Sequence, residues 1–164
     1  MRLDDRDLKI LSVLQTEGRI TKTDLAARVN LSPTPCWQRL KRLEDAGVIE
    51  GYGARVSLAA LGPLSVIFME AEINSHTVED FGRFESALQD IPEIVECWAV
   101  GGGIDYVMKF ICKDVGAYQR LVDEILQADI GLKRYYTYVV TKPVKSTPGV
   151  PFAALAISDK PAKE

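Results

Sequence analysis

Residue types that could recognise a charged polymer gather in one short stretch near the N-terminus. Residues 28–43 contain no acidic side chain but four basic ones, from Arg28, Arg39, Lys41 and Arg42. The net charge of the chain is −3, yet residues 1–50 hold nine Lys or Arg against eight Asp or Glu. A local basic patch can attract a phosphate backbone whatever the sign of the total charge. The stretch therefore predicts a contact with nucleic acid.

Three helices are predicted over the first fifty residues, and the last of them carries the basic patch. Asp4 and Thr21 are placed to accept hydrogen bonds from the first turns of the first two helices. Ser32 caps the third, with Pro33 at its first position, where a missing N–H costs nothing. A short turn joins the last two helices, which is the helix-turn-helix plan.

The third predicted helix has two contrasting faces. Cys36, Leu40, Leu43 and Gly47 recur at spacings of three and four and are expected to pack inward. The other face bears groups that bind phosphates or base edges, in the half of the helix that enters a major groove. We predict DNA contacts there, although a merely solvated face is the alternative. The predicted contacts come from Ser32, Thr34, Pro35, Gln38, Arg39, Lys41 and Arg42.

The second half of the chain has a different hydrophobic period. Its order is strand, helix, strand, strand, helix, strand, which predicts a ferredoxin-like α+β domain with an antiparallel sheet. The sheet has one uncovered face, so we predict a homodimer formed through it. The elements are expected at residues 64–73, 78–90, 94–100, 104–112, 115–127 and 132–141. The predicted domains are a DNA-binding domain at residues 1–50, an extended linker at 51–63, a regulatory and assembly domain at 64–143 and a C-terminal tail at 144–164. The tail is expected to be extended and partly disordered, although residues 152–157 could dock on a neighbouring subunit.

A second place for chemistry is the glycine run 101–103 with Asp105 beyond it. Three glycines expose backbone N–H groups and let a carboxylate approach closely, and an aspartate can accept hydrogen bonds from an ammonium group. This turn is therefore the best candidate for a ligand contact. A glycine-rich hairpin turn with a surface aspartate and no ligand explains the same residues.

The remaining reactive residues argue against an enzyme. Cys36, Cys97 and Cys112 are far apart without metal-ligand spacing, and His76 is the only histidine, expected as a solvated loop residue. No metal, cofactor or Cys–His nucleophile is therefore predicted. Two alternatives stay open, because sheets of this topology host many activities. The second domain could be catalytic, or the helical domain could bind a protein and not DNA.

The bulk composition is that of a globular protein. Hydrophobic residues make up 47% of the chain and charged residues 26%, with no apolar run near the roughly 20 residues that cross a membrane. The N-terminus MRLDDRDLKI is too acidic and too polar for a secretory signal. We therefore expect a cytoplasmic protein with no membrane partner.

The stretch from Leu3 to Val56 resembles the N-terminal domain of the Lrp/AsnC (feast/famine) family of transcription regulators. The most specific part is LSPTPCWQRLKRLEDAGVIEGY, and the resemblance continues in the same order to about Pro151. It implies that the third helix reads double-stranded DNA at a pseudo-palindromic operator. It also implies a sheet-mediated homodimer that assembles into tetramers or octamers and responds to an amino acid or related metabolite.

The resemblance also points to an effector pocket. Family members have a Gly-x-aromatic-Asp-Tyr motif at this glycine turn, and many have Thr-x-Thr in the last strand. Gly102, Asp105 and Tyr106 match the first motif, whereas Gly103 and Ile104 depart from it. The last strand carries a tyrosine and a threonine in place of two threonines. The effector residues implied are Gly102, Gly103, Asp105, Tyr135 and Thr137.

Overall fold

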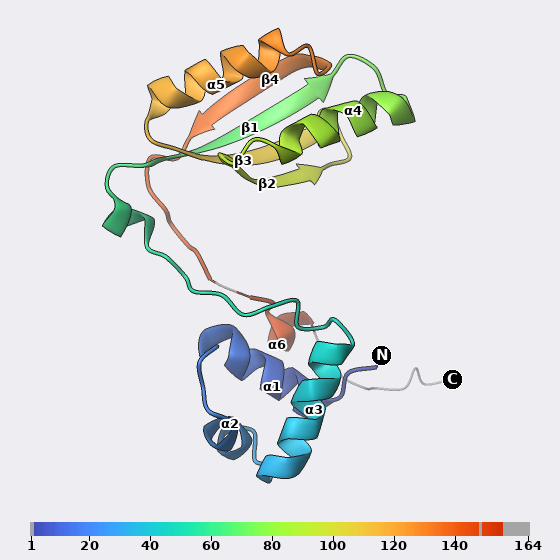
Figure 1. The fold of residues 1–164 in the computed structure, drawn as a ribbon, viewed down its shortest axis with the longest axis vertical. Coiled ribbons are helices and arrows are strands. Elements are labelled where there is room, and N and C mark those ends of the chain that lie inside the picture. Colours follow the sequence, from blue (N-terminus) through green and yellow to red (C-terminus); the bar gives the residue numbers. More distant parts are fainter. Residues whose placement is uncertain (1, 148, 156–164) are drawn as a thin grey trace. The chain divides into compact units, whose positions relative to one another are not determined.

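A computed structural model of the chain describes residues 2–147 and 149–155 and divides into two compact units. One unit runs to Arg55 and takes in the described residues from Lys145 onward, and the other is Val56–Val144 (Figure 1). The expected order of a helical domain followed by an α+β domain is confirmed.

The helical unit contains α1 (Asp5–Thr16), α2 (Lys22–Arg28) and α3 (Pro33–Asp45). The Asp4 side chain accepts from the N–H groups of Arg6 and Asp7, and the Asp7 side chain accepts from the Asp4 N–H, which completes a capping box. Thr21 caps α2 by accepting from the Asp24 N–H. Ser32 has the extended backbone of an N-cap, although its side chain makes no capping hydrogen bond.

The three helices close around one apolar core. It consists of Ile10, Leu11, Leu25, Ala26, Val29, Cys36, Leu40 and Leu43. The predicted inward face of the third helix is correct except at Gly47, which is exposed. The helix ends at Asp45, so Gly47 lies beyond it with φ of +67°, the left-handed conformation that closes many helices.

The C-terminal segment belongs to this helical unit. The Gln15 side chain bonds both backbone groups of Val150, and α6 (Phe152–Leu155) follows. Phe152 packs against the helical core, beside Leu3, Leu11, Leu14, Val48, Ile49 and Tyr52. The segment was expected to be extended and partly disordered, with the option that residues 152–157 dock on a neighbouring subunit. Its described part forms a helical turn at Phe152–Leu155, and Phe152 packs on its own chain. Docking on a neighbour stays a prediction, and residues 156–157 lie outside the described ranges.

The second unit is a four-stranded antiparallel sheet in the order β2-β3-β1-β4. Its elements are η1 (Leu58–Leu61), β1 (Ser65–Ile73), α4 (Val78–Gln89), β2 (Ile94–Ala99), β3 (Tyr106–Cys112), α5 (Val115–Gln127) and β4 (Leu132–Val139). Each predicted strand and helix is found within two residues of its expected bounds. The short 3-10 helix η1, inside the predicted linker, was not expected.

Both helices of this unit pack on one face of the sheet (Figure 1). Alternate residues of β1 and β3 are buried there, as the period of two along a strand requires. Phe84 of α4 lies 4.8 Å from Tyr106 and Tyr118 of α5 lies 5.2 Å from Phe110, measured between ring centroids. The other face of the sheet has no helix over it in the described part of the chain.

Candidate DNA interface and effector site

The exposed face of α3 gathers most of the predicted DNA contacts. Cys36, Leu40 and Leu43 anchor the helix in the core. Residues three and four positions apart share a helix face, so the exposed Thr34, Gln38 and Lys41 lie together on the outer side. Ser32 and Arg42 are also exposed, whereas Pro35 and Arg39 are partly buried.

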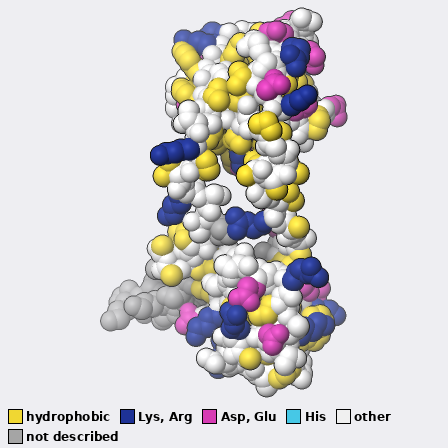
Figure 2. Space-filling view, turned by 90° about the vertical axis from the view of Figure 1, so that its left-hand side faces the viewer, with side chains coloured by type: hydrophobic (Ala, Val, Ile, Leu, Met, Phe, Trp, Pro, Cys, Tyr) yellow, Lys and Arg dark blue, Asp and Glu magenta, His cyan; other side chains and the backbone are white. Residues whose placement is uncertain are grey.

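Two of the predicted contacts, Arg39 and Arg42, are engaged by acids of α1. Arg39 Nη1 donates to Asp4 Oδ2 at 2.7 Å and to Asp7 Oδ1 at 2.9 Å. Arg42 Nη2 donates to Asp7 Oδ2 at 2.6 Å. Lys and Arg side chains also lie beside acidic ones on the face of the helical unit that is visible in Figure 2. The sequence contained no signal for these pairs, because the partners are more than thirty residues apart.

The electrostatics of this cluster follow from those contacts. Burial raises the pKa of the Asp4 carboxyl, but hydrogen bonds from the Asp7 N–H and the Arg39 guanidinium outweigh it, so the pKa lies below its ordinary value. Hydrogen bonds to Asp4 and Asp7 raise the pKa of Arg39. Asp4 and Arg39 are therefore held in their charged forms.

An aromatic residue that the sequence analysis did not select borders the same face. Trp37 of α3 is 38% exposed, and Lys22 Nζ lies 3.2 Å from the centroid of one of its rings. This cation–π contact joins the start of α2 to α3. The cation therefore lies at the edge of the predicted DNA-binding face.

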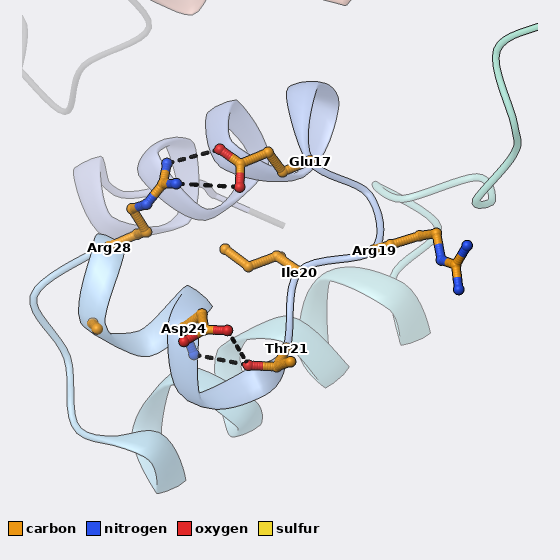
Figure 3. A pocket seen from close by; sticks show the side chains of 7 residues that line it. Glu17, Arg19, Ile20, Thr21, Asp24 and Arg28 are labelled. Carbon is orange, nitrogen blue, oxygen red and sulfur yellow. Dashed lines mark hydrogen bonds and ion pairs between the residues drawn. The ribbon is translucent and has the colours of Figure 1, made fainter.

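An open pocket of about 720 Å³ lies between the end of α1 and α2 (Figure 3). Its charged groups are largely paired with one another. Arg28 donates to both oxygens of Glu17, at 2.8 and 3.2 Å, and Thr21 donates to Asp24 at 2.7 Å. Arg19 points away from the pocket in Figure 3. These internal pairs favour a structural role for the pocket over a ligand site.

The glycine turn between β2 and β3 places Asp105 against the end of β1. Asp105 Oδ2 accepts from the Ile73 N–H at 2.9 Å, and its backbone N–H donates to Ala71. Gly102 has φ of +143°, a conformation that side chains disfavour. Much of the acceptor capacity of Asp105 is therefore used within the chain.

His76 lies against this turn, which its position in a separate loop did not indicate. Its Nε2 is 2.9 Å from Asp105 Oδ1, and its ring centroid is 5.9 Å from that of Phe81. The side chain is still 59% exposed. His76 is thus exposed, as expected, but it is paired and lies beside a predicted effector residue.

The other two predicted effector residues lie on β4. On β1, Ala71 is paired with Tyr135 of β4 on one side and with Tyr106 of β3 on the other. Because Tyr106 follows the glycine turn directly, Tyr135 lies at the same end of the sheet as that turn. Thr137 is paired with Met69, and its hydroxyl is 2.7 Å from that of Tyr118. Burial raises the pKa of Tyr118. The fold brings Tyr135 near the turn and ties Thr137 to α5.

The uncovered face of the sheet is rich in aromatic side chains. Phe68 is paired with Tyr138 on β4 and with Lys109 on β3, and paired residues share a face. Trp98, Tyr136 and Tyr138 on the same face are 45–50% exposed. The Tyr138 hydroxyl donates to Glu70 at 3.0 Å, and this bond raises the pKa of Tyr138. Such a patch is typical of a surface that binds another protein surface.

Two general features are absent from the described part of the chain. No three His, Cys, Asp or Glu side chains there are grouped as metal ligands would be. Among the helices of residues 2–147 and 149–155, none combines the length and the apolar character that crossing a membrane requires.

Comparison with known proteins gives matches over both units. Residues 3–50 match a family model described as winged helix-turn-helix DNA-binding, and residues 66–150 match the Lrp/AsnC ligand binding domain. The chain is 50% identical to transcriptional regulatory protein DoeX of Halomonas elongata, over 97% of this chain and 98% of that protein. It is 40% identical to the leucine-responsive regulatory protein of Escherichia coli, over 88% of each.

A solved structure supports the same likeness. A transcriptional regulator of Neisseria meningitidis, in complex with L-methionine, superimposes with a TM-score of 0.86 at 34% identity. The match covers 93% of this chain and 99% of that one.

Proposed function

The chain belongs to the Lrp/AsnC family of transcription regulators, and on that premise we propose that α3 reads an operator while the second unit binds an amino acid and assembles subunits. Its relatives are transcription regulators and not enzymes. The observation that carries the proposal is the polar face of α3, which is exposed because the opposite face of the helix is buried in the core of the helical unit. Residues 1–50 then bind DNA and residues 64–143 regulate and assemble, linked by residues 51–63, and the protein acts in the cytoplasm.

The proposed DNA contacts divide into two kinds. The N-terminal half of α3 enters the major groove, so its residues Thr34, Pro35 and Gln38 read base edges. The two subunits of a dimer do so in successive half-sites of a pseudo-palindrome. Lys41, Arg42 and the start of α3 at Ser32 bind phosphates, which fix register but carry no sequence information. Arg39 was also predicted as a DNA contact from the sequence, and its guanidinium is bonded to Asp4 and Asp7.

Binding to the promoter region of the chain's own gene tests this proposal. Measured by fluorescence anisotropy, affinity is expected to fall about 10³-fold or more between 50 and 200 mM salt, as for six or more phosphate contacts. Gln38→Ala should lower the ratio of promoter to unrelated DNA affinity by roughly 5–100-fold, the effect of one lost base contact. The control Gln119→Ala, on α5, should leave the ratio unchanged. A wild-type protein that binds no promoter fragment contradicts the proposal.

The effector is proposed to be an amino acid bound near the glycine turn. The related structure from N. meningitidis holds L-methionine, and several relatives are named for their response to leucine. The proposed contacts are Gly102, Gly103, Asp105, Tyr135 and Thr137, the residues named from the sequence. The position of His76 beside Asp105 adds it to the candidates.

Asp105→Asn is the informative substitution at this site. The amide oxygen can still accept from the Ile73 N–H, so the melting temperature without ligand should stay close to that of the wild type. The variant should bind L-methionine or L-leucine at least about tenfold more weakly, as expected for the loss of a hydrogen bond to a charged group. The rise in melting temperature that either amino acid causes should therefore be smaller than in the wild type. Asp123→Asn, on the exposed side of α5, is the control. Equal ligand responses in Asp105→Asn and wild type would show that Asp105 does not bind the effector.

Assembly is proposed through the uncovered sheet face. A symmetric pair of such faces would bury Phe68, Trp98, Tyr136 and Tyr138. Further association to tetramers or octamers is the family expectation and remains a proposal here.

A further inference from the structure

The capping box of α1 is joined directly to the arginines of α3. Asp4 and Asp7 satisfy each other's backbone N–H groups, and their carboxylates also accept from two guanidinium groups. The four side chains form one network, which we call the Asp–Arg network: Asp4, Asp7, Arg39 and Arg42. The same residues that begin α1 therefore also hold two cations of the predicted DNA-binding helix.

Burial distinguishes this network from the other ion pairs of the unit. Asp7 is 0% exposed and is the only buried charged side chain among residues 2–147 and 149–155. The Arg28–Glu17 pair, by contrast, is 56% and 43% exposed, and pairs of that kind hold their partners only weakly. A buried carboxylate with both oxygens bonded fixes the groups that donate to it.

The two arginines differ in what they leave available. Arg39 is 25% exposed and uses one nitrogen to bond both acids. Arg42 is 49% exposed and bonds only Asp7, so it has one carboxylate partner where Arg39 has two and is about twice as exposed. Arg42 is thus oriented by Asp7 and still able to donate to a phosphate, whereas Arg39 lies between two carboxylates.

We propose that Asp4 and Asp7 are positioning residues for DNA recognition, which orient Arg42 toward one phosphate and hold Arg39 away from a second. The inference rests on the proposed DNA contacts of α3. Phosphate contacts raise affinity for all sequences alike, so withholding one cation lowers non-specific binding. A fixed phosphate contact also sets the register in which base-reading residues meet the operator. The acids therefore increase sequence discrimination without touching a base.

Asp4→Asn tests this directly, because the asparagine oxygen can still cap the helix while its NH2 group replaces the oxygen that accepts from Arg39, and the negative charge is lost. Asp5→Asn is the matched control: it removes the same charge one residue away, at an exposed position outside the network. Circular dichroism and melting temperature establish that both variants are folded. Affinity for a promoter fragment and for a scrambled fragment is then measured by anisotropy over a series of salt concentrations.

In Asp4→Asn, Arg39 keeps only its bond to Asp7, as Arg42 does in the wild type, so it should become able to donate to a phosphate. Affinity for scrambled DNA is expected to rise about 3–10-fold, and the promoter-to-scrambled ratio should fall. The slope of log K against log salt should steepen by about 1.8, which is about 0.9 for each subunit of the proposed dimer. Asp5→Asn should keep the wild-type slope and ratio. Arg39→Ala should also keep the slope, whereas Arg42→Ala should flatten it by about 1.8, or about 0.9 for each subunit, and weaken binding to both DNAs.

Two results would overturn the inference while leaving the proposed function intact. One is Asp4→Asn giving the same slope and ratio as Asp5→Asn. The other is Arg39→Ala flattening the slope as much as Arg42→Ala, which would make Arg39 an ordinary phosphate contact. A wild-type protein that does not prefer the promoter fragment would instead overturn the proposed function, and this inference with it.

Discussion

Asp7→Ala is expected to lower the free energy of unfolding of the helical unit by about 3 kcal/mol, at the low end of the cost of breaking a buried ion pair. Asp7 accepts from Arg39, from Arg42 and from the Asp4 N–H, and all three bonds are lost at once. The arginines are partly exposed and can regain water, so the upper end of that range does not apply. A loss of this size is a large fraction of the stability of a small domain.

The measurement needs a probe confined to the helical unit. The chain has two tryptophans, Trp37 on α3 and Trp98 on β2, so urea unfolding followed by fluorescence in a Trp98→Phe background reports Trp37 alone. Asp5→Ala is the control, since an exposed acid in the first turn contributes only about 0.3–1 kcal/mol. A loss below 1 kcal/mol in Asp7→Ala would show that the network contributes little to the fold.

Phe68→Glu is expected to convert the proposed dimer into single chains and to weaken promoter binding about 100-fold or more, since a dimer reads two half-sites together. The substitution places a carboxylate between Tyr138 and Lys109 on the uncovered sheet face, and Lys109 already donates to Glu96. Burying that added charge in a symmetric interface would occur twice, once for each subunit. Light scattering coupled to size exclusion gives the mass, and anisotropy gives the DNA affinity.

Ser86→Glu controls for added charge. Ser86 is exposed on α4, which packs on the opposite side of the sheet. This variant should keep the wild-type mass and affinity. If Phe68→Glu also keeps the wild-type mass, the subunits associate through another surface.

Most elements of the fold could be predicted because each depends on local chemistry. Asp4, Thr21 and Pro33 mark the starts of the three N-terminal helices, and the structure begins a helix at or directly after each. The alternation along residues 65–73 likewise reports a strand with one buried face. These signals come from residues close together in sequence, which fold the same way whatever the rest of the chain does.

The contacts that modify the candidate sites could not be predicted in this way. Arg39 meets Asp7 across thirty-two residues, and His76 meets Asp105 across twenty-nine. On a helical wheel Arg39 is simply a polar residue at the margin of the exposed face. Whether such a cation is free or paired depends on how α1 crosses α3, and no local pattern encodes that crossing.

The position of Phe152 changes how the molecule can be dissected. Since the chain leaves the helical unit after Arg55 and rejoins it from Lys145 onward, the sheet unit is an insertion within the helical unit, attached at both of its ends. A fragment that stops at Arg55 would lack an aromatic side chain of its own core and the two backbone bonds to Gln15. A fusion of the first 55 residues to residues 145–164 through a flexible linker is therefore the better minimal DNA-binding module, and two cuts, not one, are needed to release the sheet unit.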